Sequence, residues 1–253
     1  MRKHTFLLLC LFWIKQSLNA QCPVAPVTLT NQTQVNAFPT NFPNCENLAV
    51  LLTISGANIN NLNGLASIQT TSNSIILRDN PQLTSLAGLS NLTSIAVELK
   101  IENNDALTSL SGLDNLSWLG GHLSIEGNAL LATLDGIGPI PSLGSYLNIS
   151  FNPVLTDITA LNNLTEIGPS YFNGFLAINN NNSLQAINGL DLITANGSYF
   201  FLGSNPALTT VNGLNGLTTV NRDFEIAGNP SLTDLNAFAS LTTIDGSFNV
   251  DNN

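Results

Sequence analysis

Aromatic and imidazole side chains recur at one position of a repeating pattern in this sequence. The residue directly before each short alternating apolar segment is, in successive units, Glu98, His122, Tyr146, Phe175, Tyr199 and Asp223. If these segments are strands that stack in register, equivalent side chains lie ~4.8 Å apart on one outer face. Phe201 lies one column across, and Tyr171 and Phe172 stand just before Phe175. An outward aromatic group of this kind predicts a contact surface for a protein or a carbohydrate.

A structural interpretation of the same aromatic residues is also open. The segment GPSYFNG at 168–174 makes its unit five residues longer than the others, and it could fold over the rings as a small satellite core. The two interpretations predict different exposure of the rings but the same set of residues. The candidate binding residues are His122, Tyr146, Tyr171, Phe172, Phe175, Tyr199 and Phe201.

Charged residues offer little for catalysis or metal binding. Outward positions on neighbouring units carry Arg78, Lys100, Glu98, Glu102 and Glu126. A solvated ion-pair cluster, worth about 0–1 kcal/mol per pair, explains them. His122 has no nucleophile or Asp partner in its column, and runs such as 103–105 supply single carboxylates, too few for a strong calcium site. We therefore expect no enzyme, no cofactor and no metal site.

A repeat positions these side chains. Its first residue is an Asn that recurs with spacings of 24, 24, 24, 29, 24, 24 and 24, at Asn80, Asn104, Asn128, Asn152, Asn181, Asn205, Asn229 and Asn253. A fixed period in this range is typical of a solenoid, in which each unit buries its apolar face by stacking on its neighbours. Stacked at one corner, the Asn amides can satisfy backbone groups of the turn and of adjacent coils. We interpret them as a structural Asn ladder.

Within each unit, one stretch is typical of a strand. Two shorter apolar stretches follow the Asn, and we call them the first and second apolar steps. Leu99 and Ile101 enclose a polar residue, the period-2 pattern of a half-buried strand. Apolar residues spaced by three follow, but Gly88 interrupts them, so we expect short strands or extended turns rather than a helix. Small residues recur at one corner, where the backbone turns tightly or lies against the next coil: Gly64, Gly88, Gly112, Gly136, Ala160, Gly189, Gly213 and Ala237.

The first twenty residues have the features of a secretory signal peptide. A basic start at 2–4, an apolar core at 6–14 and a small residue at Ala20 fit this class, and the apolar core is too short to span a bilayer. We expect the mature chain to be secreted, extracellular or at the cell surface, without membrane insertion. It keeps three basic residues against sixteen acids, a formal charge of −13. That charge repels nucleic acid and anionic membranes.

Residues 21–47 do not follow the repeat and are expected to form an N-terminal cap. Residues 27–30 predict a short strand, and 32–38 one or two helical turns that Pro39 ends. Cys22 and Cys45 are an even pair in an exported chain and predict a disulfide. Closing that loop is worth about 3 kcal/mol. A metal site is the alternative, but His122 is the one His left in the mature chain.

The repeat resembles the receptor L-domain family. The unit NPxLTSLxGLxNLTSIxGxLxIxN, preceded by the segment FPNC at 42–45, carries the resemblance, which covers roughly 22–253. Ordinary leucine-rich repeats place Leu two residues after the Asn, whereas here it is three, as from Asn104 to Leu107. The resemblance implies a right-handed β-helix-like solenoid that binds rather than catalyses, most like the bacterial cell-surface members. Receptor signalling is not implied, because the Cys-rich domains of those receptors are missing.

The sequence thus predicts an all-β fold: a right-handed parallel β-helix-like or leucine-rich-repeat-like solenoid of about nine 24-residue coils over 48–253, with an N-terminal disulfide cap. We expect the C-terminus to be truncated, since no cap follows Asn253. The expected function is binding or adhesion to a protein or glycan. Alternatives are a passive spacer or surface-layer component, a polysaccharide-active enzyme, or an ice-binding protein. The last rests on a Thr column, 84, 108, 156, 209 and 233, that Ala132 and Gln185 break.

Overall fold

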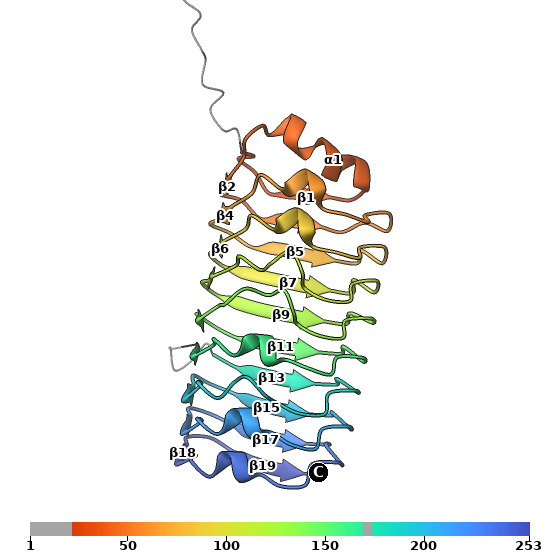
Figure 1. Ribbon diagram of the computed structural model, residues 1–253. Helices are drawn as coiled ribbons and strands as arrows, with labels where there is room; N and C mark the ends of the chain where they lie inside the picture. The colour runs from red at the N-terminus through yellow and green to blue at the C-terminus, as the bar shows by residue number, and fades with distance from the viewer. Residues whose placement is uncertain (1–21, 169–173) are drawn as a thin grey trace, which may run out of the picture.

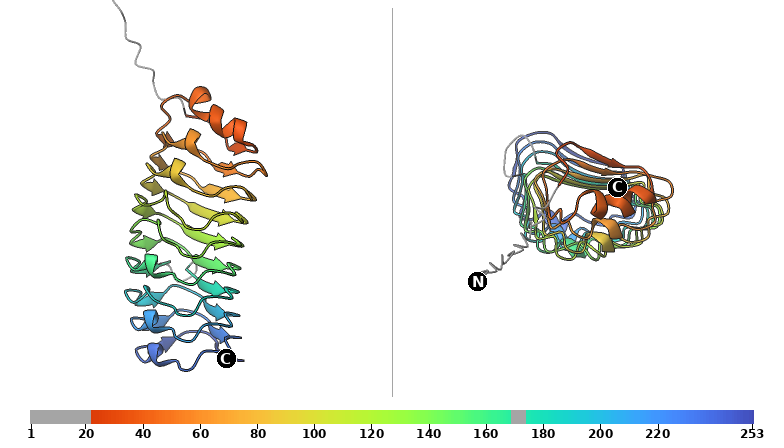
Figure 2. Two further views of the ribbon diagram at one scale, coloured as in Figure 1. Left: turned by 45° about the vertical axis from the view of Figure 1, so that its right-hand side comes forward. Right: turned by 90° about the horizontal axis from the view of Figure 1, so that it is seen from above.

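The computed structural model describes residues 22–168 and 174–253, which form two parallel sheets and one α-helix in an elongated stack (Figures 1 and 2). The ten-stranded sheet contains β1 (Val27–Leu29), β3 (Leu52–Ile54), β5 (Ile75–Arg78), β7 (Glu98–Glu102), β9 (His122–Glu126), β11 (Leu147–Ser150), β13 (Leu176–Asn179), β15 (Phe200–Gly203), β17 (Phe224–Ala227) and β19 (Phe248–Asp251). The nine-stranded sheet contains β2 (Asn47–Leu48), β4 (Thr70–Thr71), β6 (Ser94–Ile95), β8 (Trp118–Leu119), β10 (Ser142–Leu143), β12 (Glu166–Ile167), β14 (Ala195–Asn196), β16 (Thr219–Val220) and β18 (Thr243–Ile244).

The chain alternates between the two sheets along its length. Each strand pairs in parallel with the strand one unit earlier, as Leu99 pairs with Ile75 and Ile101 with Leu77. The apolar residues between the sheets are buried in one continuous core. The expected all-β, parallel, solenoid-like architecture is confirmed. The predicted signal peptide at 1–20 lies outside the described residues, and within 22–168 and 174–253 every helix is too short or too polar to span a bilayer.

The helix α1 (Gln32–Asn41) lies across the N-terminal end of the stack (Figure 1). The Asn31 side chain caps its start by accepting the backbone N–H of Gln34 at 3.0 Å. Val35 and Phe38 are buried against the first coil, with 0% and 1% of their surface exposed. A helix in this place covers the apolar end that the first unit would otherwise expose.

The prediction that Pro39 ends this helix was wrong. The helix continues to Asn41, and Phe42 N–H donates to Phe38 O at 2.8 Å. Pro39 has no N–H for the carbonyl of Val35, the cost that a proline imposes within a helix. That carbonyl points at Gly64, where an added Cβ would lie 1.9 Å from its oxygen. Packing against the first coil therefore holds the helix together past the proline.

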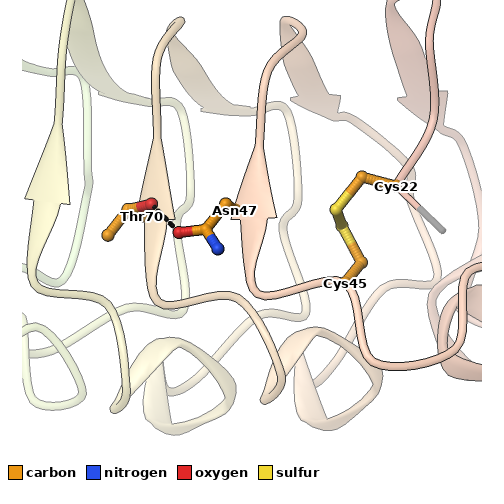
Figure 3. The surroundings of a disulfide bond; sticks show 4 residues. All are labelled: Cys22, Cys45, Asn47 and Thr70. Atoms are coloured by element: carbon orange, nitrogen blue, oxygen red, sulfur yellow. Dashed lines mark hydrogen bonds between the residues drawn. A yellow bond between two sulfur atoms is a disulfide. The ribbon is translucent and has the colours of Figure 1, made fainter. Parts of the chain in front are cut away.

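The predicted disulfide between Cys22 and Cys45 is present, and it ties the start of the described chain to the segment that enters β2 (Figure 3). Cys45 is fully buried and belongs to the core. Beside it, Thr70 Oγ1 donates to Asn47 Oδ1 at 2.6 Å, which links β4 to β2 (Figure 3). The disulfide thus closes the N-terminal cap on itself just before the chain enters β2.

The two apolar steps of each unit form different structures. The second step forms the short strands of the nine-stranded sheet, as expected. Several first steps instead form 3₁₀ turns: Asn63–Leu65, Ala87–Leu89, Thr159–Leu161, Asn212–Leu214 and Asn236–Phe238. In the turn Ala87–Leu89, the backbone N–H of Leu89 donates to Leu86 O at 2.8 Å, the i→i+3 bond of a 3₁₀ helix, and both leucines are fully buried.

Gly88 shows why small residues recur at the corner that contains these turns. A Cβ added there would lie 2.0 Å from the carbonyl oxygen of Leu62 in the preceding unit. Adjacent coils therefore approach more closely at this corner than a side chain would permit.

The Asn ladder is a continuous hydrogen-bonded column along the solenoid. From Asn80 to Asn229 its members are fully buried. At a typical position, Asn104 Nδ2 donates to Leu77 O at 3.0 Å, and Asn128 Oδ1 accepts the backbone N–H of Asn104 at 3.0 Å. Each amide therefore hydrogen-bonds backbone groups of its own corner and of the adjacent coils.

A left-handed residue precedes each ladder Asn, and the sequence pattern did not reveal it. Its φ lies between 53° and 70° at Asp79, Asn103, Gly127, Phe151, Asn180, Ser204, Gly228 and Asn252. This conformation suits Gly and Asn but is unfavourable for an aromatic residue. Phe151 is therefore the strained member of the column, and 57% of its surface is exposed.

The last strand, β19, lies at an open end of the core. Phe248 and Val250 are 64% and 39% exposed. A cavity of about 320 Å³ opens beside them and is lined mainly by Phe224, Phe238 and Phe248.

Candidate binding face

Backbone pairing in the ten-stranded sheet sets the positions of the predicted aromatic residues. The amide of Leu123 donates to Tyr146 O at 3.0 Å, that of Leu147 to Phe175 O at 3.0 Å, and that of Leu176 to Tyr199 O at 3.0 Å. These bonds place equivalent residues of successive units side by side on the outer face. We define the aromatic column as His122, Tyr146, Phe175 and Tyr199, all of which are partly exposed.

Three rings of the aromatic column, those of His122, Tyr146 and Phe175, stack on one another. The centroids of His122 and Tyr146 lie 4.2 Å apart with planes inclined by 17°, and those of Tyr146 and Phe175 lie 4.3 Å apart with planes inclined by 9°. Tyr146 thus has a ring on each face and offers mainly its edge to solvent.

Phe201 adds a ring beside the column. Its centroid lies 5.9 Å from that of Tyr199, and its ring lies over Gly203, where an added Cβ would be 2.3 Å from Phe201 Cζ. The structure thus brings together five of the seven predicted candidate residues: His122, Tyr146, Phe175, Tyr199 and Phe201. The other two, Tyr171 and Phe172, lie outside the described residues, so the satellite-core interpretation of 168–174 remains a prediction.

Two glutamates fix the tyrosine hydroxyls, which sequence reasoning missed. Tyr146 Oη donates to Glu98 Oε1 at 3.5 Å across His122, and Tyr199 Oη donates to Glu225 Oε2 at 2.5 Å. Glu98 could have been found as the residue that heads the column. Glu225 could have been found as the neighbour of Phe201 in the next strand.

These contacts change the acidity of both phenols. Burial, together with the negative charges of Glu98 and Glu126 and the hydrogen bond to Glu98, raises the pKa of Tyr146 to about 12. Burial and the hydrogen bond to Glu225 also raise the pKa of Tyr199 well above its ordinary value. Both hydroxyls are therefore protonated near neutral pH and act as donors.

The carboxylate of Asp223 closes the far end of the column. It accepts the backbone N–H of Ser247 at 2.8 Å, and this bond is the main reason why the pKa of Asp223 is lowered. At the other end, Nδ1 of His122 is buried and has no hydrogen-bond partner among the residues that the structure describes.

The ion-pair cluster forms around Lys100 rather than Arg78. Lys100 Nζ lies 3.2 Å from Glu102 Oε2 and 3.7 Å from Glu126 Oε1. Burial lowers the pKa of Lys100, but Glu102 and Glu126 outweigh it and the net pKa is raised. Across 22–168 and 174–253, Arg78 makes no ion pair within 4.0 Å, although it lies in register with Glu102.

The described residues contain no group of three or more His, Cys, Asp or Glu side chains placed to hold a metal ion. A polar cavity of about 290 Å³ lies beside the nine-stranded sheet and is lined in part by Glu166 and Gly197. The candidate face is an outer sheet surface, which suits contact with an extended partner.

Comparison of the chain with protein-family models, with curated proteins and with solved structures gives no match.

Proposed function

We propose that this protein is a secreted or cell-surface binding and adhesion module that contacts a protein or glycan through the outer face of its ten-stranded sheet. Its scaffold is a right-handed parallel β-helix-like solenoid of about nine 24-residue coils, of the receptor L-domain type. One observation supports the proposal: aromatic rings stack on the outer face of the ten-stranded sheet, which does not contribute to the core.

The fold does not require aromatic residues at these positions. The equivalent outward residue in other units is Ser74 or Ser247, and the sheet pairs there in the same way. Partly exposed aromatic side chains are instead enriched where proteins bind partners. The large area and few rotatable bonds of these side chains make such contacts strong for their size.

A passive spacer is the alternative, and the Asn ladder favours it. A column of buried, mutually hydrogen-bonded amides from Asn80 to Asn229 makes the scaffold rigid whether or not any face binds a ligand. A spacer would tolerate loss of the aromatic column as long as the scaffold folds.

The test compares two triple variants in ligand screens on glycan arrays and displayed peptides. Tyr146→Ala/Phe175→Ala/Tyr199→Ala removes the column, whereas Leu130→Ala/Val154→Ala/Leu192→Ala removes exposed apolar residues elsewhere. Ligands of the wild-type protein should bind the first variant at least about tenfold more weakly and the second unchanged. Circular dichroism must show that both variants fold.

If every ligand bound the column variant as tightly as the wild type, the spacer would be the better assignment. Secretion is tested separately. If residues 1–20 are a signal peptide that is removed on export, the exported protein begins at Gln21. N-terminal sequencing of the exported protein would detect any other start.

A further inference from the structure

We infer that the aromatic column binds an extended protein segment that carries two basic side chains about seven residues apart. This inference rests on the proposed function and names the class of its partner. It follows from the charges at the two ends of the column, from the distance between them, and from the way the rings stack.

Carboxylates stand at both ends of the column. Glu98 lies at one end, where it is in register with His122. Glu225 and Asp223 lie at the other end, where Leu202 and Ile226 pair β15 with β17. Hydrogen bonds from Tyr146 and Tyr199 hold the two glutamates at the column, and a neutral phenol leaves their negative charge in place.

The basic residues nearby leave these charges available. Lys100 forms its ion pairs within 4.0 Å with Glu102 and Glu126, and the more distant charge of Glu98 makes a smaller contribution to the raised pKa of Lys100. Arg222 is exposed beside Asp223 and makes no ion pair within 4.0 Å among the described side chains. A partner with positive charge at each end therefore finds unpaired carboxylates, and the acidic balance of the whole chain also attracts it.

The distance between the two ends sets the spacing in the partner. Glu98 is in β7 and Glu225 is in β17, five strand-to-strand steps away. At ~4.8 Å per step, the carboxylates are about 24 Å apart along the stack. An extended chain advances by about 3.4 Å per residue, so seven residues cover this distance.

The stacking geometry favours a protein segment over a glycan. Sugars stack on open ring faces, but the faces of Tyr146 are covered by His122 and Phe175 at 4.2 and 4.3 Å. Acidic glycans would also meet carboxylates at both ends. Ring edges and the Phe201 side chain instead suit β-branched side chains between the two basic residues.

The experiment measures two labelled peptides of the same composition by fluorescence anisotropy. One is acetyl-Lys-(Thr-Val)₃-Lys-amide, with the lysines at its ends, and the other has both lysines together at its centre. The first should bind the wild-type protein roughly tenfold more tightly, because it alone reaches both carboxylates. Added salt should reduce the difference.

Glu98→Gln/Glu225→Gln should abolish the preference for the end-spaced peptide. Glu46→Gln/Glu166→Gln removes the same charge from exposed sites away from this face and should leave the preference intact. Equal binding of the two peptides, or an unchanged preference in Glu98→Gln/Glu225→Gln, would overturn the inference.

Different experimental results would overturn this inference and the proposed function. If a neutral glycan bound in a way that depended on Tyr146, Phe175 and Tyr199, the inference of a cationic protein segment would be wrong. The proposal of a binding face would stand. If no ligand depended on those residues, both proposals would be wrong.

Discussion

Phe151 occupies a backbone conformation that its side chain disfavours. Its φ is 57°, and the corresponding corner residues include Asn103, Gly127, Asn180 and Gly228, which adopt the left-handed region at lower cost. Its ring is mainly exposed, so the burial of the ring offsets little of the conformational energy that the left-handed backbone costs.

Phe151→Asn should therefore raise the free energy of unfolding by about 1 kcal/mol, since it relieves left-handed strain without opening the core. Asn180→Phe is the reciprocal change at the equivalent corner and should lower it by a similar amount. Urea denaturation measures both. A stability loss in Phe151→Asn would show that its ring makes contacts worth more than the strain.

Tyr146 should make stability depend on pH in the alkaline range. Its pKa in the folded protein is about 12, above the ordinary 10.0 that applies once the chain unfolds. Above pH 10 the folded state therefore holds a proton that the unfolded state has lost. The stabilising contribution is complete below pH 10 and is lost as pH rises from 10 to about 12.

Tyr146→Phe should flatten this part of the pH profile, because the substituted residue has no phenolic proton. Unfolding free energies measured on either side of pH 10 for both proteins test this, with Thr84→Ser, a remote substitution without a phenol, as the control. An identical slope in wild type and Tyr146→Phe would contradict the assigned environment of Tyr146.

The Asn ladder lies at a corner of the solenoid that recurs from coil to coil. At Asn152, the amide nitrogen donates to Ile125 O and Ser150 O at 3.0 Å each, and Oδ1 accepts the backbone N–H of Asn128 at 3.1 Å. Ser150 O also accepts the backbone N–H of Gly127 at 3.0 Å, so the bonds of Asn152 add to the pairing of the sheet at this buried corner.

Asn152→Leu should lower stability by about 3 kcal/mol or more, because it removes several buried hydrogen bonds and leaves the buried N–H of Asn128 without its acceptor, which alone costs about 1–3 kcal/mol. Asn91→Leu is the matched control: its exposed amide donates to one carbonyl, Ala66 O at 2.8 Å, and its loss should cost about 1 kcal/mol or less. Thermal and urea denaturation compare the two. Equal losses would mean that the ladder has no special structural role.

Over the whole molecule, contacts run between neighbouring units, so stability is local along the stack. The disulfide Cys22–Cys45 and α1 close the N-terminal end, whereas β19 leaves the other end exposed. A change at one end should therefore reach only the nearest strands.

Cys22→Ser/Cys45→Ser should cost about 3 kcal/mol in the cap, the value expected for a loop of this length. Hydrogen exchange should speed up in β1 and β3 and stay unchanged in β11. Equal loss of protection in β1 and β11 would show that the stack unfolds as one cooperative unit.

The repeat pattern in the sequence predicted most of the architecture. A 24-residue period with alternating apolar pairs predicted parallel sheets, and the spacing of the Asn residues predicted their column. These features were readable because each unit makes the same contacts with its neighbours, so one local pattern specifies them all. The disulfide was readable because two cysteines leave one pairing.

Tertiary structure decided what depends on contacts between particular residues. The helix α1 continues past Pro39 because its Val35 and Phe38 are buried in the core. Several first apolar steps form 3₁₀ turns whose leucines are buried between neighbouring coils. Tyr146 reaches Glu98, 48 residues away, because two strand-to-strand steps bring them onto one face. Period and composition set the stacking of the units, but side-chain reach and packing across them decide which groups meet.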